Sequence, residues 1–230
     1  MERILEGKEP AALLPVFRGR GVLPPAGQGE VAFAHLCRKA GEFAAKVLPY
    51  VASGKPEAVD ATFDLDRFRF CGRLEEIYPV GLLRYRCANR KARDLLSLWV
   101  EHLTLCASES ESKPRSSFLI AKDRICSFAP VHNADRHLAS LLGLYLQGLS
   151  EPLPFFPESS LAFVTSGGDH AKALATWLGT EWKDGEGDDH SVSRCFGEAD
   201  PEELIASQRF RELAEAVYSP LLAALGEGAP

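Results

Sequence analysis

The chain has 230 residues, of which 46% are hydrophobic and 25% charged, and its net charge is −6. These values are ordinary for a globular protein with one substantial core or two small ones. No apolar run approaches the ~18 residues of a membrane span, no basic-then-apolar secretory signal is visible, and the negative charge argues against indiscriminate binding to nucleic acid.

Two whole-chain features bear on the class of protein. Residues 2–7 start no recognisable element, so we expect a fragment of a longer subunit. The six cysteines are scattered without a Cys-x-x-Cys pair. That usage is typical of reduced, mostly buried thiols in a cytoplasmic protein rather than of a zinc site or a disulfide scaffold. They are Cys37, Cys71, Cys87, Cys106, Cys126 and Cys195.

The first 58 residues predict an arm and a helix that pack on a core formed by residues 59–230. Residues 10–29 are rich in proline and glycine and predict a long arm or loop. Apolar residues then recur at helical spacing from about Glu30 to Val47, which predicts a helix that ends at Ser53–Pro56.

The middle of the chain predicts a sheet with one long helix. Apolar and polar residues alternate between turn residues, which favours antiparallel strands, and a later stretch has apolar residues at helical spacing. In chain order we expect a meander over 59–87 with a turn at Asp66-Arg67, a helix over roughly 90–106, a polar, mobile loop over 107–114, and a hairpin of 117–121 with 125–129.

The last third predicts helices. Asn133 could cap a helix that stops at Gly148, and a short helix should run from Asp169 to Leu178. Asp200–Glu203 is a strong helix start, with an acid before a proline and a glutamate three residues later. Pro220 should kink or break that last helical region, and residues 226–230 should form a frayed tail.

The most informative stretch is Gly72–Tyr78 followed by Leu82–Arg86 and an amphipathic helix. This is the skeleton of a metal-dependent nuclease core, which needs an acid on the first strand and an acid and a lysine, two residues apart, on the second. Glu75 fits the first position, but Arg84 and Arg86 hold the other two. A guanidinium cannot ligate Mg²⁺ and repels it, so we expect no catalytic residues, no metal and no cofactor, with Glu75 in an ion pair.

Basic residues continue from the second strand into the first turn of the helix. Positive charges there oppose the helix dipole, at a cost of about 0.3–1 kcal/mol each when exposed. They could instead hold a phosphate, which makes this cluster the candidate DNA-binding site. The open alternative is a solvated edge neutralised by Asp94 and nearby glutamates. The members are Arg84, Arg86, Arg90, Lys91 and Arg93.

Other motifs favour structural roles. Residues 184–189 resemble a calcium loop, but Asp189 replaces the required glycine and Cys195 the bidentate glutamate. His132 and His137 do not share a helical face, and Ser166 lacks the glycine two positions before it that a nucleophile elbow needs. Without a GxxxxGK[ST] motif, we expect no ATP hydrolysis.

Six segments spread over nearly the whole chain form a specific combination. They are Gly21–Pro24, Gly27–Glu30, Gly72–Tyr78, Gly81–Arg86, Leu98–Leu103 and Glu151–Pro157. Together they resemble the RecC C-terminal domain family, from the gamma subunit of exodeoxyribonuclease V (the RecBCD helicase–nuclease).

The resemblance implies a mixed α/β (α+β) fold with a restriction-endonuclease-like core, in which an antiparallel meander joins a central mixed sheet flanked by helices. It also implies a relative of the PD-(D/E)XK nuclease domain of RecB that has lost its active site. The nuclease motif Gly-x-x-Asp falls on Gly72 and Glu75, and Asp-x-Lys falls on Arg84 and Arg86. The glutamine of the following helix is missing near Leu96–Leu98.

For function, the resemblance implies a non-catalytic domain that docks RecB and RecD and lines a DNA path, either a forked duplex or a single strand, in double-strand break repair and recombination. One alternative is a residual nuclease that uses Glu75 with an acid from elsewhere, such as Glu101. Another is a purely structural bracket without DNA contact.

Overall fold

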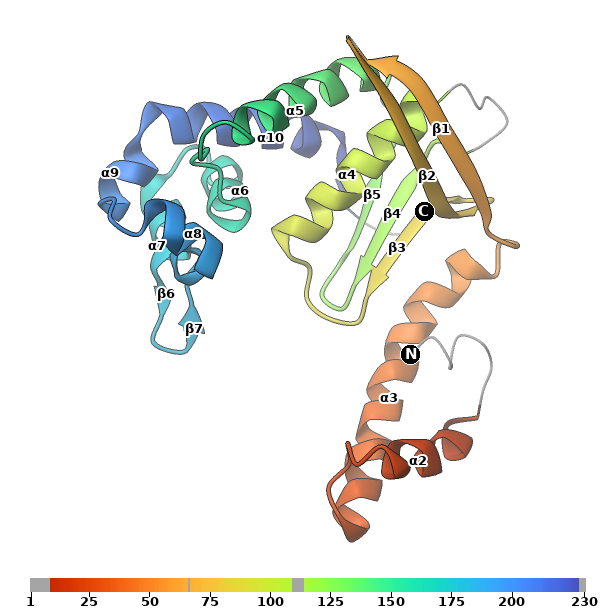
Figure 1. Cartoon of the computed structure of the whole chain (residues 1–230). Coiled ribbons are helices and arrows are strands. Elements are labelled where there is room, and N and C mark those ends of the chain that lie inside the picture. Colours follow the sequence, from red (N-terminus) through yellow and green to blue (C-terminus); the bar gives the residue numbers. More distant parts are fainter. Residues whose placement is uncertain (1–8, 66, 109–113, 228–230) are drawn as a thin grey trace.

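A computed structural model describes residues 9–65, 67–108 and 114–227. Its centre is a six-stranded sheet with the strand order β1-β2-β3-β4-β5-β8 (Figure 1). The strands are β1 (Glu57–Leu65), β2 (Phe68–Tyr78), β3 (Gly81–Arg86), β4 (Ser117–Ala121), β5 (Ile125–Phe128) and β8 (Leu225–Glu227).

The sheet is mixed, as expected. β3 and β4 pair in parallel, and the other neighbouring strands are antiparallel. The helix α4 (Ala92–Ala107) connects the two parallel strands, because such strands need a crossover. The predicted meander is confirmed as β1–β3, the predicted helix as α4, and the predicted hairpin as β4–β5.

Helices cover both faces of the sheet, and the alternation of side chains along β3 decides which residues meet which helix. Leu82 packs with Leu95 of α4 in the largest buried cluster, which also includes Leu138 of α5 (Ala134–Gly148). Leu83 packs with Val47 of α3 (Ala26–Val51) in a second cluster. Since successive strand residues point to opposite faces, Arg84 and Arg86 belong to the α4 face with Leu82.

The prediction of a long arm or loop over residues 10–29 is wrong for most of its length. Residues 10–19 form α2 (Pro10–Gly19), α3 starts at Ala26, and residues 20–25 connect the two helices. Pro10 stands in the first turn of α2, where its missing N–H is tolerated. Helix-forming alanines and leucines follow it, and they outweigh Pro15 inside the helix. Gly21 takes a φ of +66° in the turn, and the rings of Phe17 and Phe33, 5.5 Å apart, hold α2 against α3.

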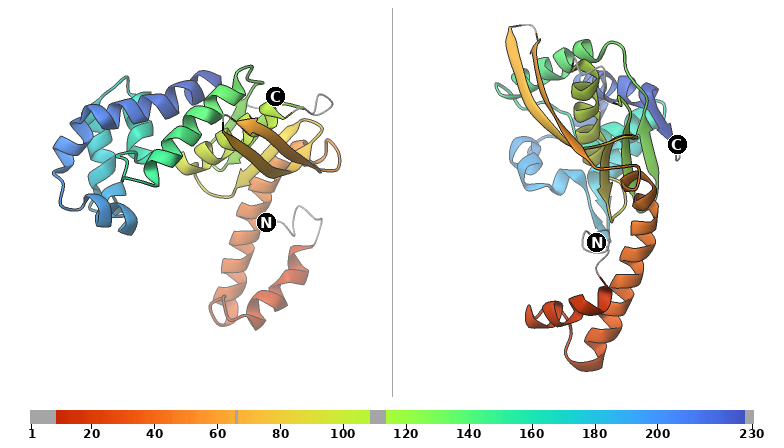
Figure 2. Two further views of the ribbon diagram at one scale, coloured as in Figure 1. Left: turned by 45° about the horizontal axis from the view of Figure 1, so that its top comes forward. Right: turned by 90° about the vertical axis from the view of Figure 1, so that its right-hand side faces the viewer.

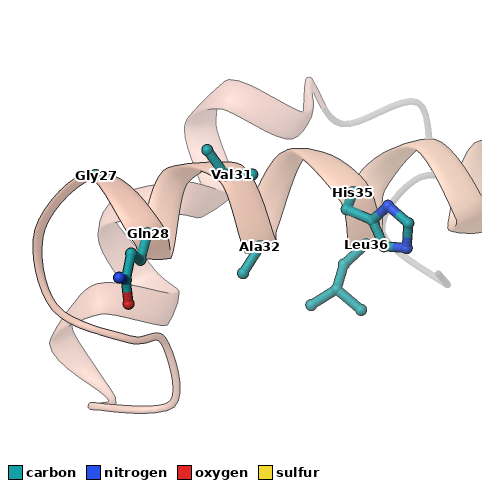
Figure 3. A pocket seen from close by; sticks show the side chains of 6 residues that line it. All are labelled: Gly27, Gln28, Val31, Ala32, His35 and Leu36. Carbon is teal, nitrogen blue, oxygen red and sulfur yellow. The ribbon is translucent and has the colours of Figure 1, made fainter.

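The predicted helix over 30–47 is confirmed, although α3 is longer at both ends and contains Pro49. Its first half and α2 stand away from the sheet (Figure 2). The outer side of this half carries Val31, Ala32 and Leu36 around a shallow apolar hollow (Figure 3). Val31 is 72% exposed and Leu36 54%.

Much of the C-terminal third packs as a helical cluster beside the sheet (Figure 1), while Leu161, Tyr218 and Leu221 join it to the main core. The helix starts predicted at Asp169 and Asp200 are confirmed, because both side chains accept hydrogen bonds from the first turns of α7 and α9. The Asn133 side chain, in contrast, makes no cap bond to α5. The elements are α6 (Pro157–Thr165), α7 (His170–Leu178), β6 (Gly179–Thr180), β7 (Lys183–Asp184), η1 (Glu186–Asp188), α8 (His190–Phe196), α9 (Pro201–Ala206) and α10 (Gln208–Ala224).

Two expectations for the C-terminus are corrected. Of the kink or break expected at Pro220, the break does not occur, because α10 continues through this residue to Ala224. Instead of fraying, Leu225–Glu227 pairs with β5, whose edge offers unpaired backbone groups. Residues 228–230 of the predicted tail lie outside the described residues, as do Asp66 of the predicted turn and 109–113 of the predicted loop.

The expectation of mostly buried thiols is also wrong. Cys106 and Cys126 are buried, but Cys71, Cys87 and Cys195 are exposed. Cys71 lies on the β1–β2 hairpin, which is largely open to solvent there, and Cys87 follows the last residue of β3. Among the described helices, none combines the length and apolarity needed to cross a bilayer.

Candidate functional site

The strand that carries Glu75 contains a β-bulge at that position. Glu57 of β1 pairs with Ile77, but Val59 pairs with Leu74, so β2 has one extra residue there. Glu76, in this extra stretch, has a φ of +61°, a conformation that residues other than glycine rarely adopt. Bulges re-aim side chains, and two successive side chains here, Glu75 and Glu76, are both exposed.

Glu75 consequently faces solvent. Its side chain is 70% exposed, and its Oε1 lies 3.5 Å from Nε of Arg73 on the same strand. A pair this open to water is weak. Glu75 meets the β3 arginine through its backbone instead, because Nη1 of Arg84 donates a 3.0 Å hydrogen bond to the Glu75 carbonyl oxygen.

Arg84 ties three elements together. Its Nη1 also donates to the Leu83 carbonyl at 2.9 Å, and its Nε lies 2.8 Å from Oε2 of Glu101 on α4. The ion pair is only about 30% exposed on each side. The contact has the length of a hydrogen bond but not its alignment, since Glu101 Oε2 has no hydrogen-bond partner among the described residues. The guanidinium thus lies between the bulge and α4 and contacts both.

Arg86, two residues further along β3 on the same face, also pairs with an acid of α4. Its Nη1 donates to both carboxylate oxygens of Asp94, at 2.8 and 3.0 Å. Oδ2 of Asp94 also accepts from the backbone N–H of Lys91 at 2.9 Å, and Oε1 of Glu158 accepts from the N–H of Ala92. Two carboxylates therefore already satisfy the first N–H groups of α4, where an anion would otherwise bind.

The remaining basic residues of the candidate site differ in exposure. Arg90 is half-buried, with its backbone N–H on Oδ1 of Asp123 and its Nη1 3.7 Å from Sγ of Cys126. Lys91 and Arg93 are exposed, and no ion pair of either with another described residue is found. The structure therefore brings all five predicted residues to one corner but leaves only these two directed to solvent as unneutralised charge.

The other motifs have structural contacts. Glu186, in the calcium-like loop, accepts from the backbone N–H groups of Glu158 and Ser159 at 3.0 and 2.8 Å and so caps α6. Ser166 donates to the Phe163 carbonyl, and His137 lies beside Trp99 at a ring distance of 6.0 Å. Within the described ranges, no three His, Cys, Asp or Glu side chains are grouped to hold a metal ion.

Several residues with structural roles at this corner are not evident from the sequence. Glu158 lies 66 positions from Ala92, so only the tertiary fold brings its carboxylate to α4. The bulge has no turn residue to announce it, because Glu76 occupies a position that favours glycine. The spacing of Asp94 and Glu101, seven residues apart on α4, is the one available signal: it places both carboxylates on one helical face.

Comparison with known proteins identifies relatives of this chain. The RecC C-terminal domain family matches residues 1–168. The RecBCD enzyme subunit RecC of Escherichia coli is 28% identical over 232 aligned positions, covering 91% of this chain and 20% of that protein. The RecC subunit of Buchnera aphidicola from Acyrthosiphon pisum is 24% identical and covers 85% of the chain. The chain thus spans about a fifth of the length of these curated relatives.

Proposed function

The chain belongs to the RecC C-terminal domain family, and from this membership we propose that it is the C-terminal domain of the gamma subunit of an exodeoxyribonuclease V (RecBCD-type) complex. In this role it serves double-strand break repair and recombination. It docks the RecB and RecD subunits and helps to guide or split DNA. Residues 59–230 are the inactivated nuclease-like domain, against which the second half of α3 packs; no cofactor is needed.

The ion pair between Arg84 and Glu101 is the observation that carries the non-catalytic role. Metal-dependent phosphodiester hydrolysis needs carboxylates free to hold a divalent cation. Here a guanidinium lies 2.8 Å from the acid on α4, and the bulge leaves the Glu75 side chain in solvent. Of the two acids of the residual-nuclease alternative, Glu101 is thereby occupied by Arg84 and Glu75 is left in solvent, and the positive charge of Arg84 opposes metal binding beside them.

At this corner we propose that Lys91 and Arg93 contact DNA, and that the positive charge of the half-buried Arg90 strengthens the attraction. Exposed cations beside a helix start are suited to phosphate oxygens, and such contacts position the nucleic acid without reading its sequence. Arg84 and Arg86 contribute indirectly, because their pairs with Glu101 and Asp94 fix α4 against β3.

Fluorescence anisotropy of a labelled forked duplex tests the DNA contact. We expect binding that weakens with salt, and a Lys91→Glu/Arg93→Glu variant whose slope of log affinity against log salt is smaller in magnitude by about two. The matched control is Lys172→Glu/Arg194→Glu, which makes the same charge change at exposed positions of α7 and α8. If both variants bind equally well, DNA does not contact this corner and the structural bracket is the better description.

A further inference from the structure

Trp182 is the most exposed large apolar side chain among the described residues, at 89% exposure. It lies in the two-residue tip of the hairpin β6–β7, where Thr180 pairs with Lys183. The other two tryptophans, Trp99 and Trp177, are 1% and 6% exposed. An indole has one of the largest apolar surfaces of any side chain, so covering it with a partner surface would contribute strongly to the free energy of binding.

The hairpin that presents Trp182 is built rigidly. Gly179 has a φ of +72°, and a Cβ there would collide with the backbone of Gly185. A Cβ at Gly185 would in turn collide with the Trp177 carbonyl oxygen. The two ends of the hairpin therefore meet the end of α7 at backbone distance, an approach that only glycine permits.

The segment after the hairpin is anchored as well. Gly187 lies against the indole of Trp177, so that a Cβ would meet the ring at 2.7 Å. Glu186 caps α6 through the N–H groups of Glu158 and Ser159. The β6–β7 hairpin, which carries Trp182 at its tip, thus extends from a fixed base beyond the helices of the C-terminal cluster (Figure 1). A pre-organised aromatic side chain loses little conformational entropy when it binds.

The charge around Trp182 indicates the chemistry of its partner. Residues 181–189 carry five carboxylates and one lysine. Such a surface repels the phosphates of DNA, which argues against base stacking by the indole. Leu178, at the end of α7 just before the hairpin, adds a second apolar side chain that is 58% exposed. An aromatic anchor within an acidic rim matches a protein surface with an apolar pocket and a basic rim.

We propose that the β6–β7 hairpin is a protein-docking element, in which Trp182 inserts into an apolar pocket rimmed by lysine or arginine on a partner subunit. The inference rests on the proposed function for the choice of probes, RecB and RecD. The acidic residues Glu181 and Asp184 then set the orientation and the rate of association, while the indole provides most of the affinity.

Biolayer interferometry of the chain against purified RecB and RecD, each alone and together, tests this proposal. Trp182→Ala should weaken binding to one partner at least about tenfold, Trp182→Phe should restore part of it, and Glu181→Lys/Asp184→Lys should weaken it further as salt is lowered. Leu149→Ala is the control, since Leu149 is another exposed apolar residue, 67% exposed, at the end of α5.

The outcomes separate the two proposals. If the unaltered chain binds neither subunit, the proposed function fails and the docking element with it. If the chain binds but Trp182→Ala binds equally well, the docking element alone is refuted. Forked-duplex affinity that falls with Trp182→Ala and rises with Glu181→Lys/Asp184→Lys, with subunit binding unchanged, would assign the indole to DNA and overturn the proposal.

Discussion

The Nε atom of Arg84 on β3 lies 2.8 Å from the Oε2 atom of Glu101 on α4, and the Nη1 atom of the same arginine donates to the carbonyl oxygen of Glu75. One guanidinium therefore bridges the sheet and the helix that covers it. If the proposed relation to metal-dependent nucleases holds, this cation of the protein stands where an active relative would have an acid that ligates the metal.

Reversing the charge of Arg84 should destabilise the fold. In Arg84→Glu, two half-buried carboxylates would face each other and the Glu75 carbonyl would lose a donor. We expect a loss of about 2 kcal/mol in the free energy of unfolding, measured by urea denaturation. The exchange Arg84→Glu/Glu101→Arg should recover part of it through restored attraction. An Arg84→Glu variant as stable as the unaltered chain would show that this arginine is free to meet DNA.

Hydrolysis of DNA by the chain alone should be absent. With Mn²⁺ and labelled single-stranded DNA, we expect no products above background, because Arg84 disfavours a cation next to Glu101. Glu75→Gln is the decisive variant, since it keeps size and exposure while removing the charge. Degradation by the chain that Glu75→Gln abolishes would establish the residual-nuclease alternative.

The elements of the fold could be predicted where the local sequence pattern is strong. The predictions fail where tertiary contacts determine the conformation. The meander and α4 have clear periodicity, and Asp169 and Asp200 are standard caps. The prediction for the region of α2 fails because prolines and glycines indicate loops when they are read locally, although Pro10 is compatible with a helix start.

The candidate site was harder to predict than the fold. Sequence spacing brings Arg84 and Arg86 to one face of β3, and their cluster with Arg90, Lys91 and Arg93 does lie at one corner. Whether these charges are neutralised depends on acids such as Asp94 and Glu101. These acids reach the arginines because α4, which connects β3 to β4, packs on this face of the sheet, and local sequence spacing does not show that. That is why a basic cluster in the sequence becomes, for two members, a set of internal ion pairs.

Removing the Glu186 carboxylate should loosen the start of α6 and the base of the β6–β7 hairpin together. Glu186→Ala leaves the N–H groups of Glu158 and Ser159 without their acceptor, which should cost about 1–2 kcal/mol. Hydrogen exchange of those two amides should accelerate. Glu181→Ala, at the exposed hairpin tip, is the control and should leave both amides unchanged; equal exchange in both variants would mean that Glu186 is not the cap.

The buried imidazole of His102 predicts how stability depends on pH. Its Nε2 lies 3.0 Å from the Ala129 carbonyl oxygen, which can only accept, so Nε2 carries the proton and Nδ1, 2.8 Å from Oγ of Ser117, accepts. Burial lowers the pKa of His102 from 6.5 to about 4, partly offset by the bond to Ala129. Since the unfolded chain takes up the proton first, stability should fall as pH drops from about 6.5 towards 4.

The loss attributable to His102 should approach about 3 kcal/mol at the acidic end. Urea unfolding at pH 7.5, 6 and 5 measures the slope, and His102→Gln, which keeps polar contacts but does not titrate, should flatten it while lowering stability at every pH. His35 on α3, which is exposed, provides His35→Gln as the matched control with an unchanged slope. If His102→Gln retained the full slope, the acid sensitivity would have to come from groups other than this buried imidazole.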